Sequence, residues 1–465
     1  MTTETRPNIL WYCTDQQRYD TIGALGNPHV HTKAVDALVA RGVAFTHAYT
    51  QNPICTPSRA SFLTGMYPST VRANGNGIAY MPEDYPLVTK LLADSGYDCG
   101  LVGKLHLASA EAGVEPRAED GYRYFAYSHA PRDDWDEGHA YVDWLKERGQ
   151  DLKTLQASDD NVPAEYHQTT WATDACIEFL DQSRNGPWLL SVNPYYPHPP
   201  FDPPREYFER FDPDALPGPL FRESDLEIQC KLADSGVDFQ NYPSTPEKMN
   251  VNVIQAQYYA MIELIDDQFQ RLLDAMEERG ELANTLVIFT SDHGESLGDH
   301  GLVEKGCRFM EGMVRVPLVF ALPGTVAADR RSDALVELTD IAPTLLEIAG
   351  LTVPESMHGM SLLPILTDDD PPEHHRDYVR SEYRAAIADL GDDTFASMIC
   401  DGRWKLNVYH GHGLGELYDL VNDPDEFTNL WDDAAHRDRK LDLLLKVLDD
   451  TVFATDWGPD RVGWI

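Results

Sequence analysis

Cys55 is the residue of this chain whose surroundings indicate chemistry most clearly. It opens the segment CTPSRASFLTG, residues 55–65. Pro57 suits the first turn of a helix, so we expect Cys55 to lie at a helix N-terminus. The free N–H groups and the positive dipole end at that point stabilise an anion. A single cysteine in such a place also fits a buried or capping residue, so its neighbours in the fold must decide between the two readings.

Two polar pairs follow apolar runs that are typical of buried strands. Asp15-Gln16 comes after Ile9–Cys13, and Asp292-His293 comes after Leu286–Thr290. Ligands of open α/β sheets gather beyond the carboxyl ends of the strands. Either pair alone also fits an aspartate that caps a helix or closes a turn. A divalent metal near position 55 would lower the pKa of a nucleophile and neutralise the oxygens of an ester.

Basic side chains follow two further predicted strands. Lys104 and His106 come after Cys99–Val102, and the alternation of an extended segment points both to the same side. A lysine and a histidine on one side suit an anion. His198 follows Trp188–Val192 in a loop bounded by prolines, and rigid loops hold functional groups well. Outside this context such side chains fit solvated loop positions equally well.

These segments together resemble the type I sulfatases of the alkaline phosphatase superfamily. The string at residues 55–65 matches their C-x-P-S-R…L-T-G maturation motif, and the G-K-x-H and P-H-x-P segments around Lys104 and His198 match as well. The resemblance runs from Pro7 to Leu430. It implies that a maturation enzyme oxidises Cys55 to formylglycine, whose hydrated aldehyde supplies the nucleophilic oxygen. One hydroxyl of that diol attacks sulfur, and the other later expels sulfate, which a plain serine or cysteine cannot do.

The resemblance also implies roles for the other residues of the site. Arg59 holds the diol, Asp292 accepts the proton of the attacking hydroxyl, and His106 takes the proton of the second one. The sulfate oxygens are contacted by Lys104, His198 and Lys305. The oxygen-rich metal site favours Ca²⁺, and its imidazole leaves Mn²⁺ open. The ligand positions that the resemblance implies are Asp15, Gln16, Cys55 (as formylglycine), Asp292 and His293.

Gln16 and His293 depart from the commonest sulfatase pattern, which has an aspartate and an asparagine there. Glutamine with histidine also occurs in phosphonate monoester and phosphodiester hydrolases of the same superfamily, and this is the main alternative function. The pair Lys104 and His106 favours a sulfatase, because those hydrolases typically lack it. A non-catalytic, anion-binding relative is a second alternative, which is disfavoured because every catalytic position is filled.

The elements that must position these residues alternate along the first part of the chain. Apolar runs separated by helical patterns predict an α/β fold with a large mixed β-sheet flanked by helices on both faces. The clearest helix covers residues 251–279, and residues 199–250 have little periodicity and predict a long surface excursion. The predicted strands are Ile9–Cys13, Val43–Tyr49, Cys99–Val102, Trp188–Val192, Leu286–Thr290 and Pro317–Ala321.

An acidic, proline-containing segment at residues 368–372 suggests a domain boundary. The chain is therefore divided into a catalytic domain, residues 1–367, and a smaller α+β domain, residues 368–465. The smaller domain is predicted to hold a short antiparallel sheet and one helix near residues 435–450. Its predicted strands are Tyr378–Tyr383, Phe395–Cys400, Trp404–Tyr409 and Glu416–Leu420.

The net charge of the chain is −40, from 37 basic and 77 acidic residues among 465. This charge argues against a nucleic acid or an anionic membrane as partner, because both require basic surfaces. The seven cysteines are scattered and never form a C-x-x-C pair, which fits a reducing compartment. No apolar run near the start is long enough for a signal peptide, so we expect a cytoplasmic enzyme that acts on a small sulfate ester.

Overall fold

The computed structural model describes residues 6–135, 137–387 and 394–454. Its larger sheet has eight strands in the order β4-β3-β5-β1-β6-β7-β2-β8, and only β7 runs against its neighbours. The large mixed sheet predicted from the sequence is confirmed. The strands are β1 (Asn8–Thr14), β2 (Val43–Tyr49), β3 (Asp98–Gly103), β4 (Tyr124–Tyr127), β5 (Trp188–Asn193), β6 (Thr285–Ser291), β7 (Leu318–Ala321) and β8 (Arg330–Glu337).

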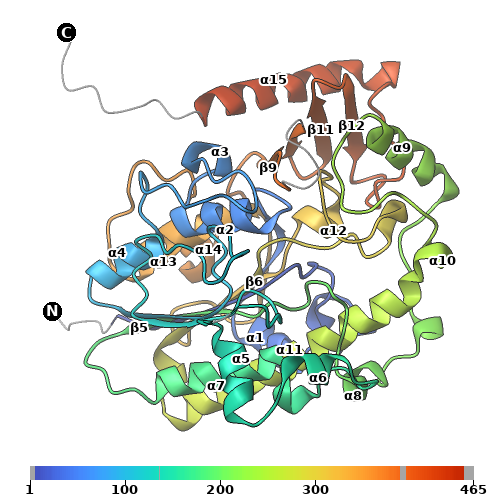
Figure 1. The fold of residues 1–465 in the computed structure, drawn as a ribbon. Helices are drawn as coiled ribbons and strands as arrows, with labels where there is room; N and C mark the ends of the chain where they lie inside the picture. The colour runs from blue at the N-terminus through green and yellow to red at the C-terminus, as the bar shows by residue number, and fades with distance from the viewer. Residues whose placement is uncertain (1–5, 136, 388–393, 455–465) are drawn as a thin grey trace.

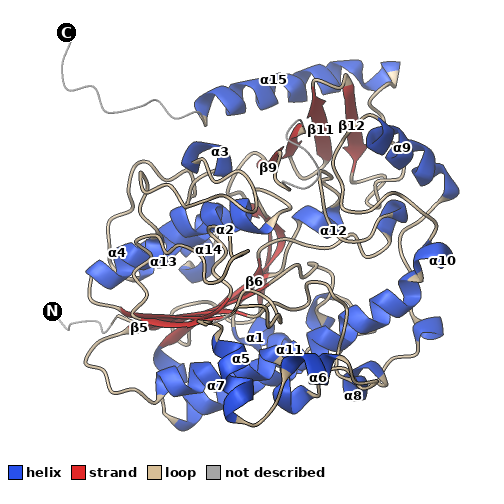
Figure 2. Cartoon of the chain, in the orientation of Figure 1, coloured by secondary structure: helices blue, strands red, loops and turns tan. Residues whose placement is uncertain are grey.

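The central strands are apolar on both faces because helices cover both sides of the sheet. Along β1, Trp11 belongs to one hydrophobic core and Tyr12 to the other, as the two-residue period of a strand requires. Figures 1 and 2 show one helical layer above the sheet and another below it. The upper layer contains α2 (Cys55–Thr64), α4 (Val88–Asp94), α13 (Ile341–Ile348) and α14 (Leu363–Thr367). The lower layer contains α1 (Lys33–Arg41), α5 (Ala140–Glu147), α7 (Gln168–Leu180) and α11 (Val251–Glu278).

Two strands and several helices were not predicted from the sequence. Both strands, β4 and β8, lie at the edges of the sheet and are only partly buried, so neither shows a continuous apolar run. Between residues 199 and 250 the expectation of irregular chain was wrong in part, because α8 (Arg205–Phe208), α9 (Glu223–Asp234) and α10 (Pro246–Met249) form there. Two of the three buried side chains of α9, Asp225 and Gln229, are polar, so the helix has no apolar stripe.

The second sheet is antiparallel, with the order β12-β11-β10-β9. One of its faces packs under helix α15 (Arg437–Phe453) through Ile399, Leu406 and Leu417. Its other face shares a core with Tyr49 and with other residues of the larger part. The predicted small sheet with one helix is confirmed, whereas the boundary between residues 367 and 368 stays a prediction. The strands are β9 (Val379–Arg384), β10 (Phe395–Cys400), β11 (Trp404–His410) and β12 (Leu414–Asp419).

The strand directions bring the chemically interesting segments to one edge of the larger sheet. Strands β3, β5 and β6 run parallel to β1 or to a neighbour that does. Because β7 is antiparallel to both β6 and β2, β2 points the same way as β6. The segments that follow all five strands therefore meet at the carboxyl edge. Among the described residues, no helix has the length and apolar character that crossing a bilayer requires.

Candidate active site

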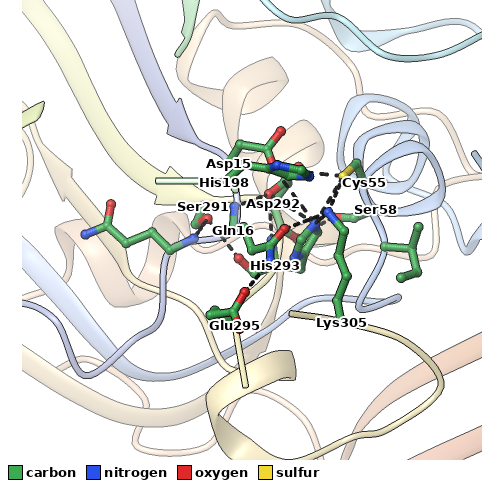
Figure 3. Close-up of polar contacts among 12 residues, drawn as sticks. Asp15, Gln16, Cys55, Ser58, His198, Ser291, Asp292, His293, Glu295 and Lys305 are labelled. Carbon is green, nitrogen blue, oxygen red and sulfur yellow. Dashed lines mark hydrogen bonds and ion pairs between the residues drawn. The ribbon is translucent and has the colours of Figure 1, made fainter. Parts of the chain in front are cut away.

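Residues that follow five strands converge at the carboxyl edge of the sheet, and Figure 3 labels those that follow β1, β2, β5 and β6. Ligand atoms of four of them lie within 4.8 Å of one another, and all four residues are buried. These are Asp15 after β1, Cys55 after β2, and the neighbours Asp292 and His293 after β6. The structure thus brings together residues that are up to 278 positions apart in the sequence, as expected from the strand ends.

Cys55 is the first residue of α2, as the position of Pro57 predicted. Its Sγ lies 3.1 Å from Nζ of Lys305 and 3.2 Å from Nε2 of His293. Burial opposes ionisation of the thiol, but Lys104, Lys305 and His293 hold its pKa well below the usual value. An anion at position 55 is thus stabilised by two lysines as well as by the helix N-terminus.

Arg59 lies one turn after Cys55 and fixes both carboxylates of the site. Its Nε donates to Oδ2 of Asp292 at 2.9 Å, and its Nη2 lies 3.4 Å from Oδ2 of Asp15. Its Nη1 donates to the carbonyl oxygen of Lys104 at 3.1 Å, which ties α2 to the loop after β3. The planar guanidinium holds several acceptors at once, so Arg59 sets the orientation of the site.

Lys104 and Asp15 form a buried ion pair of 2.5 Å between Nζ and Oδ2. Burial and Cys55 both act to raise the pKa of Asp15, but Lys104, His198 and Arg59 outweigh them and lower it. Asp15 is therefore an anion at neutral pH and can serve as an oxygen ligand. Lys104 is cationic there, since burial lowers its pKa but the charges of Asp15, Cys55 and Asp292 together raise it.

Gln16 is held in a left-handed backbone conformation, with φ of 67°, directly after β1. Its Nε2 donates to a carboxylate oxygen of Glu295, which leaves Oε1 to accept from Nζ of Lys305 at 2.7 Å. Glu295 is fully buried and was not predicted as part of the site. The hydrogen bond between Gln16 and Glu295 decides which end of the Gln16 amide faces position 55, because a carboxylate accepts only from the NH₂ end.

His293 presents a nitrogen lone pair to the same space. Its Nδ1 lies 2.9 Å from the carbonyl oxygen of Gly294 and so carries the proton, which leaves Nε2 directed at Cys55. Burial acts to lower the pKa of His293, but Asp292 and Cys55 together raise it overall. Two carboxylates, one amide oxygen and one imidazole nitrogen thus surround position 55. This donor set fits a hard divalent cation such as Ca²⁺ or Mn²⁺.

His106 also has a left-handed backbone, with φ of 57°, and a carboxylate supports its loop. Oε2 of Glu115 accepts from the N–H of His106 at 2.8 Å, and Oε1 accepts from the N–H of Leu107 at 2.9 Å. Burial, followed by the charge of Lys104, lowers the pKa of His106 to about 4. The imidazole is therefore neutral at pH 7 and is able to accept a proton. Glu115 was also missed from the sequence, because it lies in a loop without a recognisable pattern.

His198 lies near Asp15 and Cys55 in the site (Figure 3). Its Nδ1 lies 2.6 Å from the carbonyl oxygen of Pro199, and its ring packs against Tyr195 at 4.6 Å between centroids. The proline-bounded loop therefore fixes the ring, as the sequence suggested. All the site residues expected from the sequence, Lys305 included, lie around position 55.

Comparison with known proteins supports the same interpretation. A protein-family model described as sulfatase matches residues 7–351. The chain belongs to the sulfatase family. A second model, described as the C-terminal part of N-sulphoglucosamine sulphohydrolase, matches residues 298–451 of this family member. As a member of a family of hydrolases, this sulfatase-family chain is an enzyme.

Relatives of this sulfatase-family enzyme align with nearly its whole length. An arylsulfatase of Clostridium perfringens is 30% identical, over 95% of this chain and 94% of that protein. A choline-sulfatase of Rhizobium meliloti is 30% identical, over 92% and 83% respectively. Among solved structures, the phosphonate monoester hydrolase of Agrobacterium radiobacter has a TM-score of 0.82 and 28% identity, over 97% of this chain and 96% of that one. The fold is thus shared by enzymes named for sulfur esters and for phosphorus esters.

Proposed function

We propose that this chain hydrolyses a sulfate monoester of an aryl or carbohydrate alcohol, with a formylglycine made from Cys55 as the nucleophile. The convergence of Lys104, Lys305 and the neutral His106 on position 55 is the observation that carries the proposal. Two cations suit the oxygens of a sulfate group, and a neutral imidazole suits a proton transfer. In the unmodified chain Sγ of Cys55 stands in for an oxygen of the hydrated aldehyde.

A divalent metal held by Asp15, Gln16, Asp292 and His293 is part of this proposal. Ca²⁺ is favoured by the three oxygen ligands, and Mn²⁺ is the alternative because of the imidazole. When bound, the metal lowers the pKa of the nucleophilic hydroxyl and neutralises charge on the ester oxygens. The buried Arg59 would keep both carboxylates in position for it.

The side chains of the site divide the reaction into two proton transfers. Asp292 accepts the proton of the attacking hydroxyl, whose oxygen bonds to sulfur as the bond from sulfur to the alcohol oxygen breaks. Lys305 protonates or stabilises the departing alcohol oxygen, and Lys104 and His198 stabilise the equatorial oxygens. His106 then takes the proton of the second hydroxyl. The carbonyl of the aldehyde re-forms as the bond from carbon to the sulfate oxygen breaks, and sulfate leaves.

A second function is favoured by a specific pair of residues. Gln16 and His293, together with the likeness to the phosphonate monoester hydrolase, support the hydrolysis of phosphonate monoesters or phosphodiesters. Lys104 and His106 favour the sulfate ester, because the phosphonate hydrolases typically lack that pair. Fold alone does not decide between the two substrates, since one fold supports several chemistries.

Two measurements test the proposal. Mass spectrometry of the peptide that contains Cys55 should show formylglycine in enzyme from a host with the maturation enzyme. A panel of sulfate, phosphate and phosphonate esters should give the highest kcat/KM for a sulfate monoester. An active preparation with an unmodified Cys55 would exclude formylglycine as the nucleophile. A preference for phosphonate esters or phosphodiesters would favour the second function.

A further inference from the structure

The outer face of helix α15 carries a row of exposed apolar side chains. Leu441, Leu445, Leu448 and Val452 are 47%, 60%, 59% and 56% exposed. Their spacings of four, three and four residues place them on one stripe of the helix, as in the seam of a coiled coil. We call these four residues the outer stripe. Figure 1 shows α15 at the margin of the molecule, with the small sheet on one side only.

The outer stripe is not the face by which α15 joins its own chain. That contact is made by Leu443 and Val447, which are buried against Ile399, Leu406 and Leu417 of the small sheet. A surface helix normally has one apolar stripe, and its opposite face is polar. A second apolar stripe on the solvent side therefore indicates a surface that another molecule covers.

The charged residues beside the outer stripe differ between its two sides. Asp442 and Asp449 come directly after Leu441 and Leu448, which places both on one flank of the stripe. Arg437 lies four residues before Leu441, on the other flank. All three residues are exposed. Neither Arg437 nor Asp442 has an ion-pair partner within residues 6–135, 137–387 and 394–454. One flank is thus acidic and the other is basic at its N-terminal end, with charges that are available for an intermolecular contact.

We propose that the outer stripe of α15 pairs with the same stripe of a second copy of this chain, with the two helices parallel. A two-fold axis along the helices brings the basic flank of each copy against the acidic flank of the other. Arg437 then faces Asp442 of the second copy, and the symmetry repeats this pair. A two-fold axis across the helices would instead bring Asp442 close to Asp449 of the second copy, which is repulsive.

The charge of the whole chain bears on the choice of partner. An anionic membrane surface would repel both the acidic flank and a chain with a net charge of −40. Two copies also repel each other at long range, whereas the contact itself is mainly apolar. Salt screens the long-range repulsion more than it weakens apolar contact, so association should strengthen as the salt concentration rises. A contact made mainly of ion pairs would show the opposite dependence.

The pairing is tested by measuring the molar mass of the full-length enzyme by light scattering and sedimentation over a range of concentrations. The wild type should form dimers, more completely at high salt. Leu445→Asp with Leu448→Asp should give monomers that keep their fold and their specific activity, because both side chains are solvent-exposed. Val421→Asp is the matched control, since Val421 is 66% exposed but lies outside α15, and it should leave the dimer intact. A monomeric wild type, or a dimer that survives the double substitution, would overturn the proposal.

The orientation is tested with charges and with a cross-link. Arg437→Asp should weaken the dimer at least several-fold, and adding Asp442→Arg should restore it. Leu441→Cys should form a disulfide between copies in parallel helices. In an antiparallel pair Leu441 would lie near Val452 of the second copy, so the two introduced cysteines would be about 16 Å apart, beyond the roughly 7 Å between Cα atoms that a disulfide spans. A dimer in which Leu441→Cys fails to cross-link under oxidation would refute the parallel arrangement.

Discussion

Replacing Lys104 with methionine removes a charge while keeping most of the side-chain volume. Its Nζ lies 2.5 Å from Oδ2 of Asp15, and both side chains are buried. Loss of one cation that stabilises the transferring sulfate group should raise the barrier by about 3 kcal/mol, which lowers kcat/KM by about a hundredfold. Breaking a buried ion pair should also reduce the free energy of unfolding by about 3 kcal/mol. That value is the lower end of the usual range, because Arg59 still lies 3.4 Å from Asp15.

The assay must separate these two effects. Initial rates with an aryl sulfate are measured at saturating metal and at a temperature where thermal unfolding shows the variant to be folded. Lys104→Arg, which keeps the charge, serves as the control and should lose less activity than the methionine variant. The same variants are then assayed with a phosphonate monoester. If folded, metal-loaded Lys104→Met hydrolyses the sulfate ester within threefold of the wild type, Lys104 does not stabilise the transferring group and the second function gains support.

Four other expectations follow from the same geometry. Cys55→Ala and Cys55→Ser should retain the fold by circular dichroism and lose essentially all turnover. Substantial sulfatase activity in either variant would contradict the proposal that formylglycine is the nucleophile. Asp292→Asn should lose bound metal, measured by elemental analysis, together with activity, and chelation of the wild type should do the same. His106→Ala should accumulate a sulfated position 55, visible as added mass on that peptide after brief exposure to substrate. Burial raises the pKa of Glu115 from 4.5 to about 7, so its stabilising effect is complete below pH 4.5 and is lost as the pH rises through 7. The advantage of the wild type over Glu115→Gln in urea unfolding should therefore fall by up to about 3 kcal/mol between pH 5 and pH 8, and an unchanged difference would show that Glu115 does not titrate in this range.

The sequence predicts the elements that have a clear hydrophobic period. The central strands and the long helix α11 were all placed within one or two residues of their observed bounds, because both faces of these strands and one face of this helix are apolar. The edge strands β4 and β8 have a partly solvated surface, so their sequences lack the apolar runs that indicate a strand. Helix α9 was missed for a similar reason, since polar side chains occupy most of its buried positions.

The candidate site was predictable where the motif and the strand ends coincide. Asp15 and Asp292 close strands that the structure confirms, and Cys55 begins a helix as Pro57 suggested. Glu115 and Glu295 were not predictable in this way. Each acts by accepting hydrogen bonds from a neighbouring segment, and such a partnership depends on loop conformations that no local pattern encodes. Their roles are visible only when the backbone is folded.

The burial of Cys55 bears on when the proposed conversion to formylglycine can take place. Only 1% of this residue is accessible in the folded chain, and its neighbour His293 is synthesised 238 positions later. If Cys55 is converted as proposed, the maturation enzyme has to reach it before that later segment folds over it. At roughly 5–20 residues per second, synthesis of the intervening chain takes about 10–50 seconds. Under the proposed mechanism, the active fraction of the enzyme depends on whether Cys55 is converted before the later segment is synthesised and folds. A message that is translated more slowly should therefore give a larger share of converted protein.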